Sequence, residues 1–178
     1  MALGATIHTF DIELADTDRE VYQTLNLRVA QHPSETPDYL LTRVLAYCLE
    51  YREGIAFSKG LSDPDDPAIS VRDLTGALQV WVDIGLPEPE RLHRASKAAP
   101  RVAVYTHKDP AQWADRIAAA KIHRADKLDV FAFDREWLSQ LVAQLERRMK
   151  FSLARSEQEI YFTVADQTTQ TALTRPLG

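Results

Sequence analysis

The chain has 178 residues, a length typical of one domain, and its 45% hydrophobic and 26% charged residues are ordinary for a globular protein. The net charge of −5 argues against nucleic-acid binding through overall charge, although it leaves room for a local basic patch. The single cysteine, Cys48, excludes an intrachain disulfide and a cysteine-rich metal site. Without a signal-peptide pattern or an apolar run of roughly 20 residues, we expect a cytoplasmic protein that makes no membrane contact.

The first third of the chain predicts one strand followed by two helices. Alternating apolar and polar residues indicate a strand over 5–14. A capping-box pattern and apolar residues at helical spacing predict a helix over 17–31. Two prolines then interrupt the pattern, and Thr36 can cap a second helix over 37–53, whose apolar stripe includes Cys48.

The rest of the chain alternates between strand and helix patterns. The predicted elements are a strand at 55–58, an acidic loop at 59–67, a helical turn near 71–74, a strand at 78–84, a helix at 88–98, a strand at 101–106, a helix at 110–120, a strand at 128–133, a helix at 134–147 and a hairpin at 151–155 and 159–164. The threonine-rich tail can add a third strand. The segment 78–106 predicts a right-handed crossover with parallel strands. We therefore expect a single α/β domain over 1–178, with a mixed central sheet flanked by helices.

The strand at 78–84 holds the best candidate for a functional residue. Phosphate-binding, dinucleotide-binding, zinc-protease and serine-hydrolase motifs are absent, and the five histidines are scattered. Asp83 lies at the end of this strand on the same face as Gln79, and a charge there is costly unless it is paired or binds a cation. Mg²⁺ binds through one or two carboxylates with water and phosphate, so Asp83 could hold it together with Asp65, Asp66 or Glu35.

Each of these features also has a simpler interpretation. Asp83 can pair with Arg91 across the turn, the acidic loop can be a solvated turn, and Glu35 can belong to the turn before the second helix. Two basic clusters are typical of solvated surface, although either could contact nucleic acid. The clusters are Arg91, Arg94, Lys97 and Arg101, and Arg147, Arg148, Lys150 and Arg155.

Several segments together form a specific combination. They are the opening MALGATIHTF, RVAQHPSET at 28–36 with Arg43 and Ala46 after it, FSKGLSDPDD at 57–66 and WVDIGLPEPERLHRA at 81–95. In these segments, and in the order of its elements, the chain resembles the YaeQ family of proteobacterial proteins over essentially its whole length. YaeQ proteins resemble the PD-(D/E)XK nuclease superfamily, so the resemblance implies a restriction-endonuclease-like core with a C-terminal β-hairpin. The core parts would be the helix from Pro37, strands at 55, near 68 and at 78, the crossover helix at 88 and the strand at 101.

The resemblance also implies roles for particular residues. Asp83 matches the acidic residue of the third motif strand, but Gly85 stands where the motif has lysine. Some members of the superfamily carry that positive charge on the following helix, where Arg91 borders the buried face. The further candidates are Arg94 or Lys97 for the positive charge, Asp66 or Asp65 for the first motif aspartate, and Glu35 or Glu50 for an extra acid. Because arginine stays protonated, Arg91 could stabilise charge but could not act as a base.

Three hypotheses follow from this pattern. The first is a divergent Mg²⁺-dependent nuclease that hydrolyses a phosphodiester of nucleic acid. Its catalytic residues would be Asp83, Asp66, Arg91 and Glu35, and its metal ligands Asp83, Asp66 and Gln79. The second is a nuclease-fold module without catalysis that binds nucleic acid or a protein partner, as the negative net charge and Gly85 favour. The third is a protein-interaction domain with no role on nucleic acid.

Overall fold

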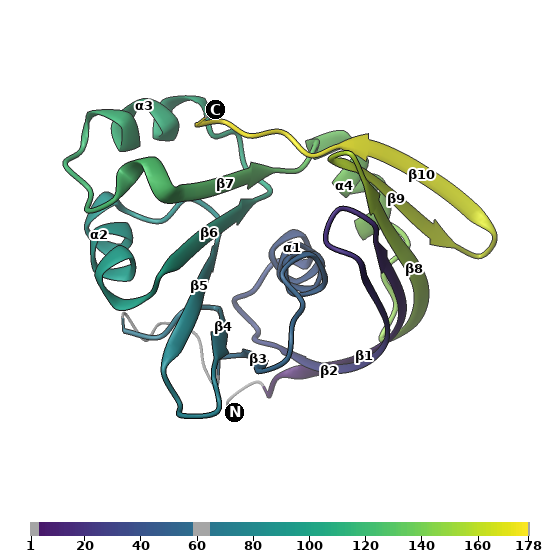
Figure 1. Ribbon diagram of the computed structural model, residues 1–178. Helices are drawn as coiled ribbons and strands as arrows, with labels where there is room; N and C mark the ends of the chain where they lie inside the picture. The colour runs from purple at the N-terminus through teal and green to yellow at the C-terminus, as the bar shows by residue number, and fades with distance from the viewer. Residues whose placement is uncertain (1–3, 59–64, 178) are drawn as a thin grey trace. The chain divides into compact units, whose positions relative to one another are not determined.

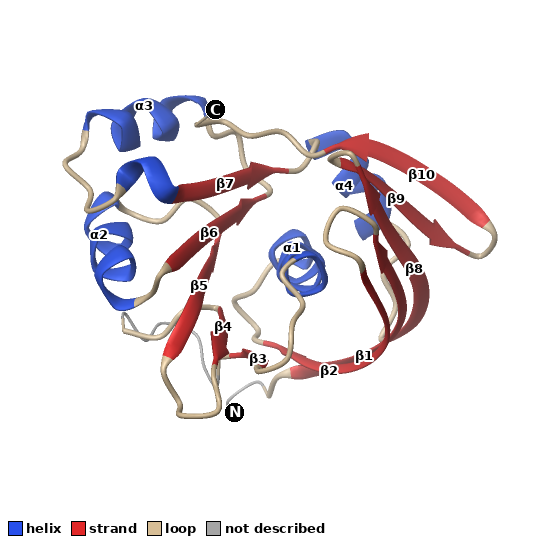
Figure 2. Ribbon diagram, viewed as in Figure 1, coloured by secondary structure: helices blue, strands red, loops and turns tan. Residues whose placement is uncertain are grey.

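The computed structural model describes residues 4–58 and 65–177 and contains ten strands and four α-helices in that part of the chain (Figures 1 and 2). In chain order these elements are β1 (Thr6–Asp16), β2 (Val21–Gln31), α1 (Pro37–Leu49), β3 (Ile55–Phe57), β4 (Ile69–Arg72), β5 (Leu78–Ile84), α2 (Pro89–Ala98), β6 (Arg101–Thr106), α3 (Ala111–Ala119), β7 (Leu128–Ala132), α4 (Arg135–Val142), β8 (Arg148–Ser156), β9 (Glu159–Val164) and β10 (Gln167–Ala172). A short 3₁₀ turn, Ala125–Lys127, precedes β7.

The elements divide into two compact units. The first unit comprises the described residues up to Leu41 together with Phe133–Leu173, and the second comprises Thr42–Ala132 together with the described residues from Thr174. Each unit contains one five-stranded mixed sheet and helical segments. The predicted mixed α/β class is therefore confirmed, but the strands form two sheets where the sequence predicted one central sheet.

The sheet of the first unit has the strand order β10-β9-β8-β1-β2 (Figure 1). Strand β8 pairs with β1 in parallel, and every other neighbouring pair is antiparallel. Residues Phe10 and Ile12 of β1 and Phe151 and Leu153 of β8 are buried, and the residues between them are exposed. This alternation places one face against the core and the other in solvent. The predicted C-terminal hairpin and its third strand are confirmed.

The predicted helix over 17–31 is wrong, because this segment forms β2. Leu25, Leu27 and Val29 are buried and alternate with exposed residues, which is the two-residue period of a strand. The apolar residues at helical spacing were a subset of this alternation. Pairing with β1 runs through the whole strand and satisfies its backbone groups on that side, whereas a local capping pattern offers only a few hydrogen bonds.

Two helices begin as predicted but end earlier. The Thr36 hydroxyl accepts a hydrogen bond from the Tyr39 backbone at 3.1 Å at the start of α1, and the Asp134 carboxylate accepts one from the Trp137 backbone at 2.8 Å at the start of α4. Helix α1 ends at Leu49 and α4 at Val142. Residues 143–147, which the pattern predicted as helix, instead form the turn that leads into β8.

The sheet of the second unit has the order β3-β4-β5-β6-β7. Strands β3, β4 and β5 form an antiparallel meander, whereas β5, β6 and β7 are parallel, which confirms the parallel strands predicted for 78–106. The helical turn predicted near 71–74 is wrong. Ile69 and Val71 are buried on alternate positions of β4, so the period is again two residues.

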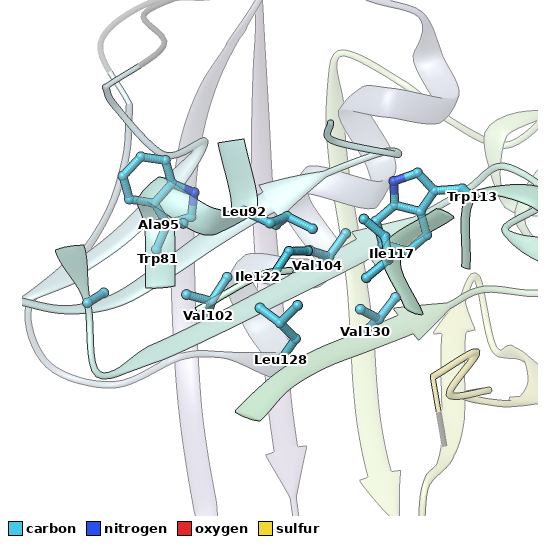
Figure 3. Packing of buried hydrophobic residues seen from close by; sticks show 11 residues of the cluster. Trp81, Leu92, Ala95, Val102, Val104, Trp113, Ile117, Ile122, Leu128 and Val130 are labelled. Carbon is cyan, nitrogen blue, oxygen red and sulfur yellow. The ribbon is translucent and has the colours of Figure 1, made fainter. Parts of the chain in front are cut away.

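Helices α2 and α3 pack on the parallel part of this second sheet (Figure 3). The buried side chains that join the helices, the sheet and the loop before β7 are Trp81, Leu92, Ala95, Ala99, Val102, Val104, Trp113, Ile117, Ile122, Leu128 and Val130. This packing fixes the orientation of α2 relative to the end of β5. Within the part of the chain that the structure describes, no helix combines the length and the apolar character that crossing a membrane requires.

Gly54 occupies a turn before β3 in which a side chain has no room. Its φ is +91°, and a Cβ built there would collide with the carbonyl oxygen of Arg72. The Gly54 carbonyl also accepts a hydrogen bond from the Arg72 backbone at 3.3 Å, so the two backbones cannot separate without losing it. We expect Gly54→Ala to lower the free energy of unfolding by about 2 kcal/mol or more, measured by urea denaturation. The open Gly76 turn has a similar φ, so Gly76→Ala is the control and should cost less.

Candidate functional site

Asp83 lies near the end of β5, next to β6, and its residue is only 3% exposed. Gly85 follows with a φ of +93°, and its N–H donates to the carbonyl of Tyr105 at 2.9 Å. This turn ends the strand and directs the chain toward α2. A carboxylate buried in this way needs hydrogen-bond donors, because leaving its charge unpaired costs several kcal/mol.

Arg91 in the first turn of α2 provides those donors. Its Nε lies 2.7 Å from Asp83 Oδ2, and its Nη2 lies 3.0 Å from Asp83 Oδ1. The two parallel hydrogen bonds make a bidentate pair, the strongest arrangement between these groups. The sequence offered this pair as the simpler interpretation of Asp83, and the structure forms it.

The guanidinium of Arg91 has two further contacts. Nη2 also donates to the backbone carbonyl of Asp66 at 2.9 Å, and the group lies 5.2 Å from the centre of the Trp81 ring, a cation–π distance. Arg91 therefore connects β5, α2 and the segment that leads into β4. Trp81 was not a predicted site residue, although strand alternation already placed it on the face of Asp83. No sequence signal indicates that Asp66 would contribute its carbonyl.

Asp65 and Gln79, two other candidates of this region, contact different partners. Asp65 is exposed and its carboxylate lies 3.7 Å from Arg94, and Asp63 lies outside the described residues. Gln79 donates its side-chain amide to Asp73 Oδ2 at 3.1 Å, in the turn between β4 and β5. The structure thus brings together Asp83, Arg91 and the backbone of Asp66, and gives Gln79 a separate partner.

Glu35 belongs to the first unit and forms part of the turn before α1. Its N–H donates to the carbonyl of His32 at 2.8 Å, and its carbonyl accepts from the Gln31 side chain at 3.0 Å. Asp83 belongs to the second unit. These backbone contacts give Glu35 the helix-start role that was its simpler interpretation.

Glu50, the alternative extra acid, forms a second buried ionic network. Its carboxylate accepts hydrogen bonds from Arg101 at 2.7 and 3.2 Å and from the Tyr105 hydroxyl at 2.8 Å. Arg101 also pairs with Asp129, which Arg175 contacts at 2.7 Å. Burial opposes the charge of Arg101, but the hydrogen bonds that Arg101 donates to Glu50 and Asp129, with the charges of these carboxylates, outweigh it and raise the pKa of Arg101. Every carboxylate in this network already has a cationic partner.

The described residues contain no group of three or more His, Cys, Asp or Glu side chains arranged to hold a metal ion. At Asp83, the guanidinium of Arg91 takes both carboxylate oxygens. A metal bound there would have to displace Arg91. Cys48 is fully buried, and burial raises the pKa of its thiol to about 12, so the thiol stays protonated and unreactive at neutral pH.

Sequence comparison finds relatives that cover almost the whole chain. A family model described as YaeQ protein matches residues 1–173. The uncharacterized protein YaeQ of Escherichia coli K12 is 32% identical over 151 residues, which cover 84% of this chain and 83% of the relative. The uncharacterized protein YaeQ of Salmonella typhi is 29% identical over 177 residues, which cover 98% and 97% of the two chains. These names state no activity.

Structural comparison agrees with the sequence match. The crystal structure of the YaeQ protein from Xanthomonas axonopodis pv. citri is similar with a TM-score of 0.88 and 29% identity, over 96% of this chain and 97% of that one. The crystal structure of the YaeQ protein from Pseudomonas syringae gives a TM-score of 0.86 at 29% identity, over 98% and 97% of the two chains. Both solved structures share the fold along nearly its full length.

Proposed function

We propose that this chain, which belongs to the YaeQ family, is a nuclease-like module that binds nucleic acid beside the Asp83–Arg91 pair without hydrolysing it. The observation that carries the proposal is the bidentate contact of Arg91 with both carboxylate oxygens of Asp83. Hydrolysis assisted by Mg²⁺ needs a carboxylate that is open to the metal. Here a permanent cation takes that place.

The order of elements in the second unit supports a nuclease-like core. Helix α1 ends in this unit and is followed by the β3–β5 meander, the crossover helix α2 and the parallel strand β6. This is the order that the PD-(D/E)XK resemblance implies, with Asp83 on the third strand of the meander. The position of the motif lysine is Gly85, whose φ of +93° strains any residue with a side chain. The backbone itself therefore disfavours a lysine there.

Two exposed cations on α2 support nucleic acid as the ligand. Arg94 and Lys97 lie on the solvent side of the helix that carries Arg91, and the side chain of Arg94 is 53% exposed. In the described part of the chain Arg94 forms one ion pair, with the exposed Asp65 at 3.7 Å. Exposed pairs of this kind contribute little energy, so phosphate can replace Asp65 at small cost.

A second candidate is Mg²⁺-dependent phosphodiester hydrolysis. One observation favours it: Arg91 Nη2 contacts the Asp83 carboxylate and the Asp66 carbonyl at the same time. Asp83 and Asp66, the two predicted motif positions, thus both contact the place that the Arg91 guanidinium occupies. If Arg91 withdrew, Mg²⁺ could bind Asp83 there, and Arg91 would be available to stabilise phosphate charge.

The two candidates differ in Mn²⁺ binding, cleavage and the effect of substitutions. For the binding module, labelled DNA and RNA should bind wild type with strong salt dependence and stay intact with Mg²⁺ or Mn²⁺. Arg94→Gln with Lys97→Gln should reduce the slope of log affinity against log salt by about 1.4 to 1.8, whereas the exposed Lys121→Gln should leave it unchanged. Electron paramagnetic resonance should show the same Mn²⁺ binding for wild type and Asp83→Asn, because Asp83 holds no metal in the binding module.

If wild type cleaves the nucleic acid and Asp83→Asn does not, the hydrolase is the correct function and the binding module is wrong. If the Arg94→Gln, Lys97→Gln double variant binds nucleic acid like wild type, nucleic acid does not bind at this site. Arg91→Met serves as the opened variant in the Mn²⁺ measurement. With Asp83 freed from its partner, Mn²⁺ should bind that variant and not its Asp83→Asn derivative, provided that circular dichroism shows both to be folded.

A further inference from the structure

The first unit exposes one face of its sheet, and this face has a distinctive composition. The strands β2, β1, β8 and β9 lie side by side in the sheet (Figure 1). Their outward residues fall into rows that cross the sheet, because the pairing register aligns them. The side chains on this face are Tyr22, Thr24, Asn26 and Arg28 of β2; Thr9, Asp11, Glu13 and Ala15 of β1; Arg148, Lys150, Ser152 and Ala154 of β8; and Tyr161 and Thr163 of β9.

One row forms a groove between two tyrosines. Tyr22 is paired with Ala15, Ala15 with Ala154, and Ala154 with Tyr161, so two small residues separate the aromatic rings. The groove has a volume of about 500 Å³, and Thr24, Ser152 and Thr163 add hydroxyl groups to its lining. Tyr22 is 60% exposed, which is unusual for a large aromatic side chain. Its ring thus offers a flat surface to a ligand.

Three cations lie on the same face, farther along the strands. Arg28 and Arg148 flank Thr9 from the two neighbouring strands, and Lys150 stands beside Asp11. All three cations are exposed, and within the described residues their side chains form no hydrogen bond or ion pair. The second basic cluster of the sequence therefore divides: Arg148 and Lys150 lie on this face, whereas Arg155 is buried against Asp16 at 2.7 Å.

Two carboxylates, Asp11 and Glu13, lie on the central strand of the face. Glu13 already accepts hydrogen bonds from the Thr24 hydroxyl at 2.9 and 3.1 Å. The cations outnumber the carboxylates and stand at the end of the face away from the tyrosines. A ligand that suits this arrangement has planar groups at one end and repeated negative charge at the other.

We propose that this sheet face binds single-stranded nucleic acid, separately from the Asp83–Arg91 site. Bases stack on Tyr22 and Tyr161 over the alanine floor, and the backbone phosphates contact Arg28, Arg148 and Lys150. Aromatic side chains on an exposed sheet stack unpaired bases in a way that tolerates many sequences, and nearby cations follow the backbone. A duplex keeps its bases stacked inside, so it cannot use the tyrosines.

The test measures fluorescence anisotropy of labelled oligo-dT and oligo-rU of about 15 nucleotides, long enough for one site of this kind. Wild type should bind both, and a duplex of equal length more weakly. Tyr22→Ala and Tyr161→Ala should each weaken binding about tenfold, whereas Tyr22→Phe should retain it. Replacing Arg28, Arg148 and Lys150 with glutamine should reduce the salt slope by about 2.

Matched controls separate this face from the rest of the molecule. Arg135→Gln removes an exposed cation on α4 of the same unit, and Leu74→Ala removes a fully exposed apolar side chain of the second unit. Both controls should bind the oligonucleotides like wild type. All substituted face residues are exposed or half-buried, so circular dichroism should show intact folding.

Three results would overturn the proposal. Absence of binding to the oligonucleotides at low salt is the first. Equal binding by wild type and the double tyrosine variant is the second. The third is a ligand of another class on the face, seen either as a dimer in sedimentation that the tyrosine substitutions dissociate, or as saturable binding of a neutral oligosaccharide with no effect of the oligonucleotides.

Discussion

Arg91→Met is expected to lower the free energy of unfolding at pH 7 by about 3–5 kcal/mol, the usual cost of leaving one member of a buried ion pair alone. The side chain of Asp83 is only 4% exposed and has both oxygens on Arg91, so the substitution leaves a largely buried carboxylate without its cationic partner. The contacts of Arg91 with the Asp66 carbonyl and the Trp81 ring are lost as well. Urea denaturation followed by tryptophan fluorescence measures the effect.

The reciprocal substitution should cost less. Asp83→Asn removes the buried charge, and Arg91, whose side chain is 24% exposed, can turn toward water. The Asp83→Leu, Arg91→Met double variant should recover much of the stability, since an apolar pair can replace a buried ion pair. If Arg91→Met and Asp83→Asn lose equal free energy of unfolding, the contacts of the guanidinium, and not the burial of the Asp83 charge, account for the loss.

This asymmetry bears on the function as well as on stability. If Asp83→Asn keeps its stability but loses a measurable activity, the Asp83 carboxylate takes part in that activity. A site in which Asp83→Asn and wild type bind nucleic acid alike would mark the pair as structural support for α2. Arg94 and Lys97 are presented by that helix, so its position matters for the proposed binding surface.

The sequence predicted the region around Asp83 well because its signals are local. Alternation in 78–84 identified β5, the following Gly85 and Pro87 identified its end, and helical periodicity placed Arg91 beside the buried side of α2. Two adjacent elements joined by a short turn leave few geometries, so the Asp83–Arg91 pair could be anticipated. The carbonyl of Asp66 could not, because a backbone contact across 25 residues leaves no trace in residue types.

The largest error of sequence interpretation was β2, and its cause is physical. The segment 21–31 carries apolar residues that fit both a helical and a two-residue period. Pairing with β1 decides between them, and that partner precedes it across a turn in which Glu20 adopts a φ of +57°. The sheet face of the first unit therefore escaped prediction. Tyr22 and Tyr161 come from strands far apart in sequence, and only the sheet register brings them into one row.

The buried ion pair between Asp16 of β1 and Arg155 of β8 should make the second large contribution to stability, and this contribution depends on pH. The Asp16 side chain is fully buried and accepts hydrogen bonds from Arg155 Nη2 at 2.7 Å and from Arg19 Nε at 2.9 Å. Burial alone would raise the pKa of Asp16, but the hydrogen bonds and charges of Arg155 and Arg19 outweigh it and lower the pKa below the ordinary 3.8. The folded protein thus holds the charged form more strongly than the unfolded chain does.

Asp16 consequently stabilises the fold above the unfolded pKa of 3.8, and this contribution is lost as the pH falls through the lower folded pKa. Asp16→Asn should cost about 3–5 kcal/mol at pH 7, because Arg155, with a side chain only 7% exposed, then keeps its charge without its nearest carboxylate. The free energy of unfolding of Asp16→Asn should vary less than that of wild type between about pH 5 and pH 2. Asp11→Asn, on the exposed face of the same strand, is the matched control and should change both quantities little. Parallel acid profiles for wild type and Asp16→Asn would contradict the role assigned to this carboxylate.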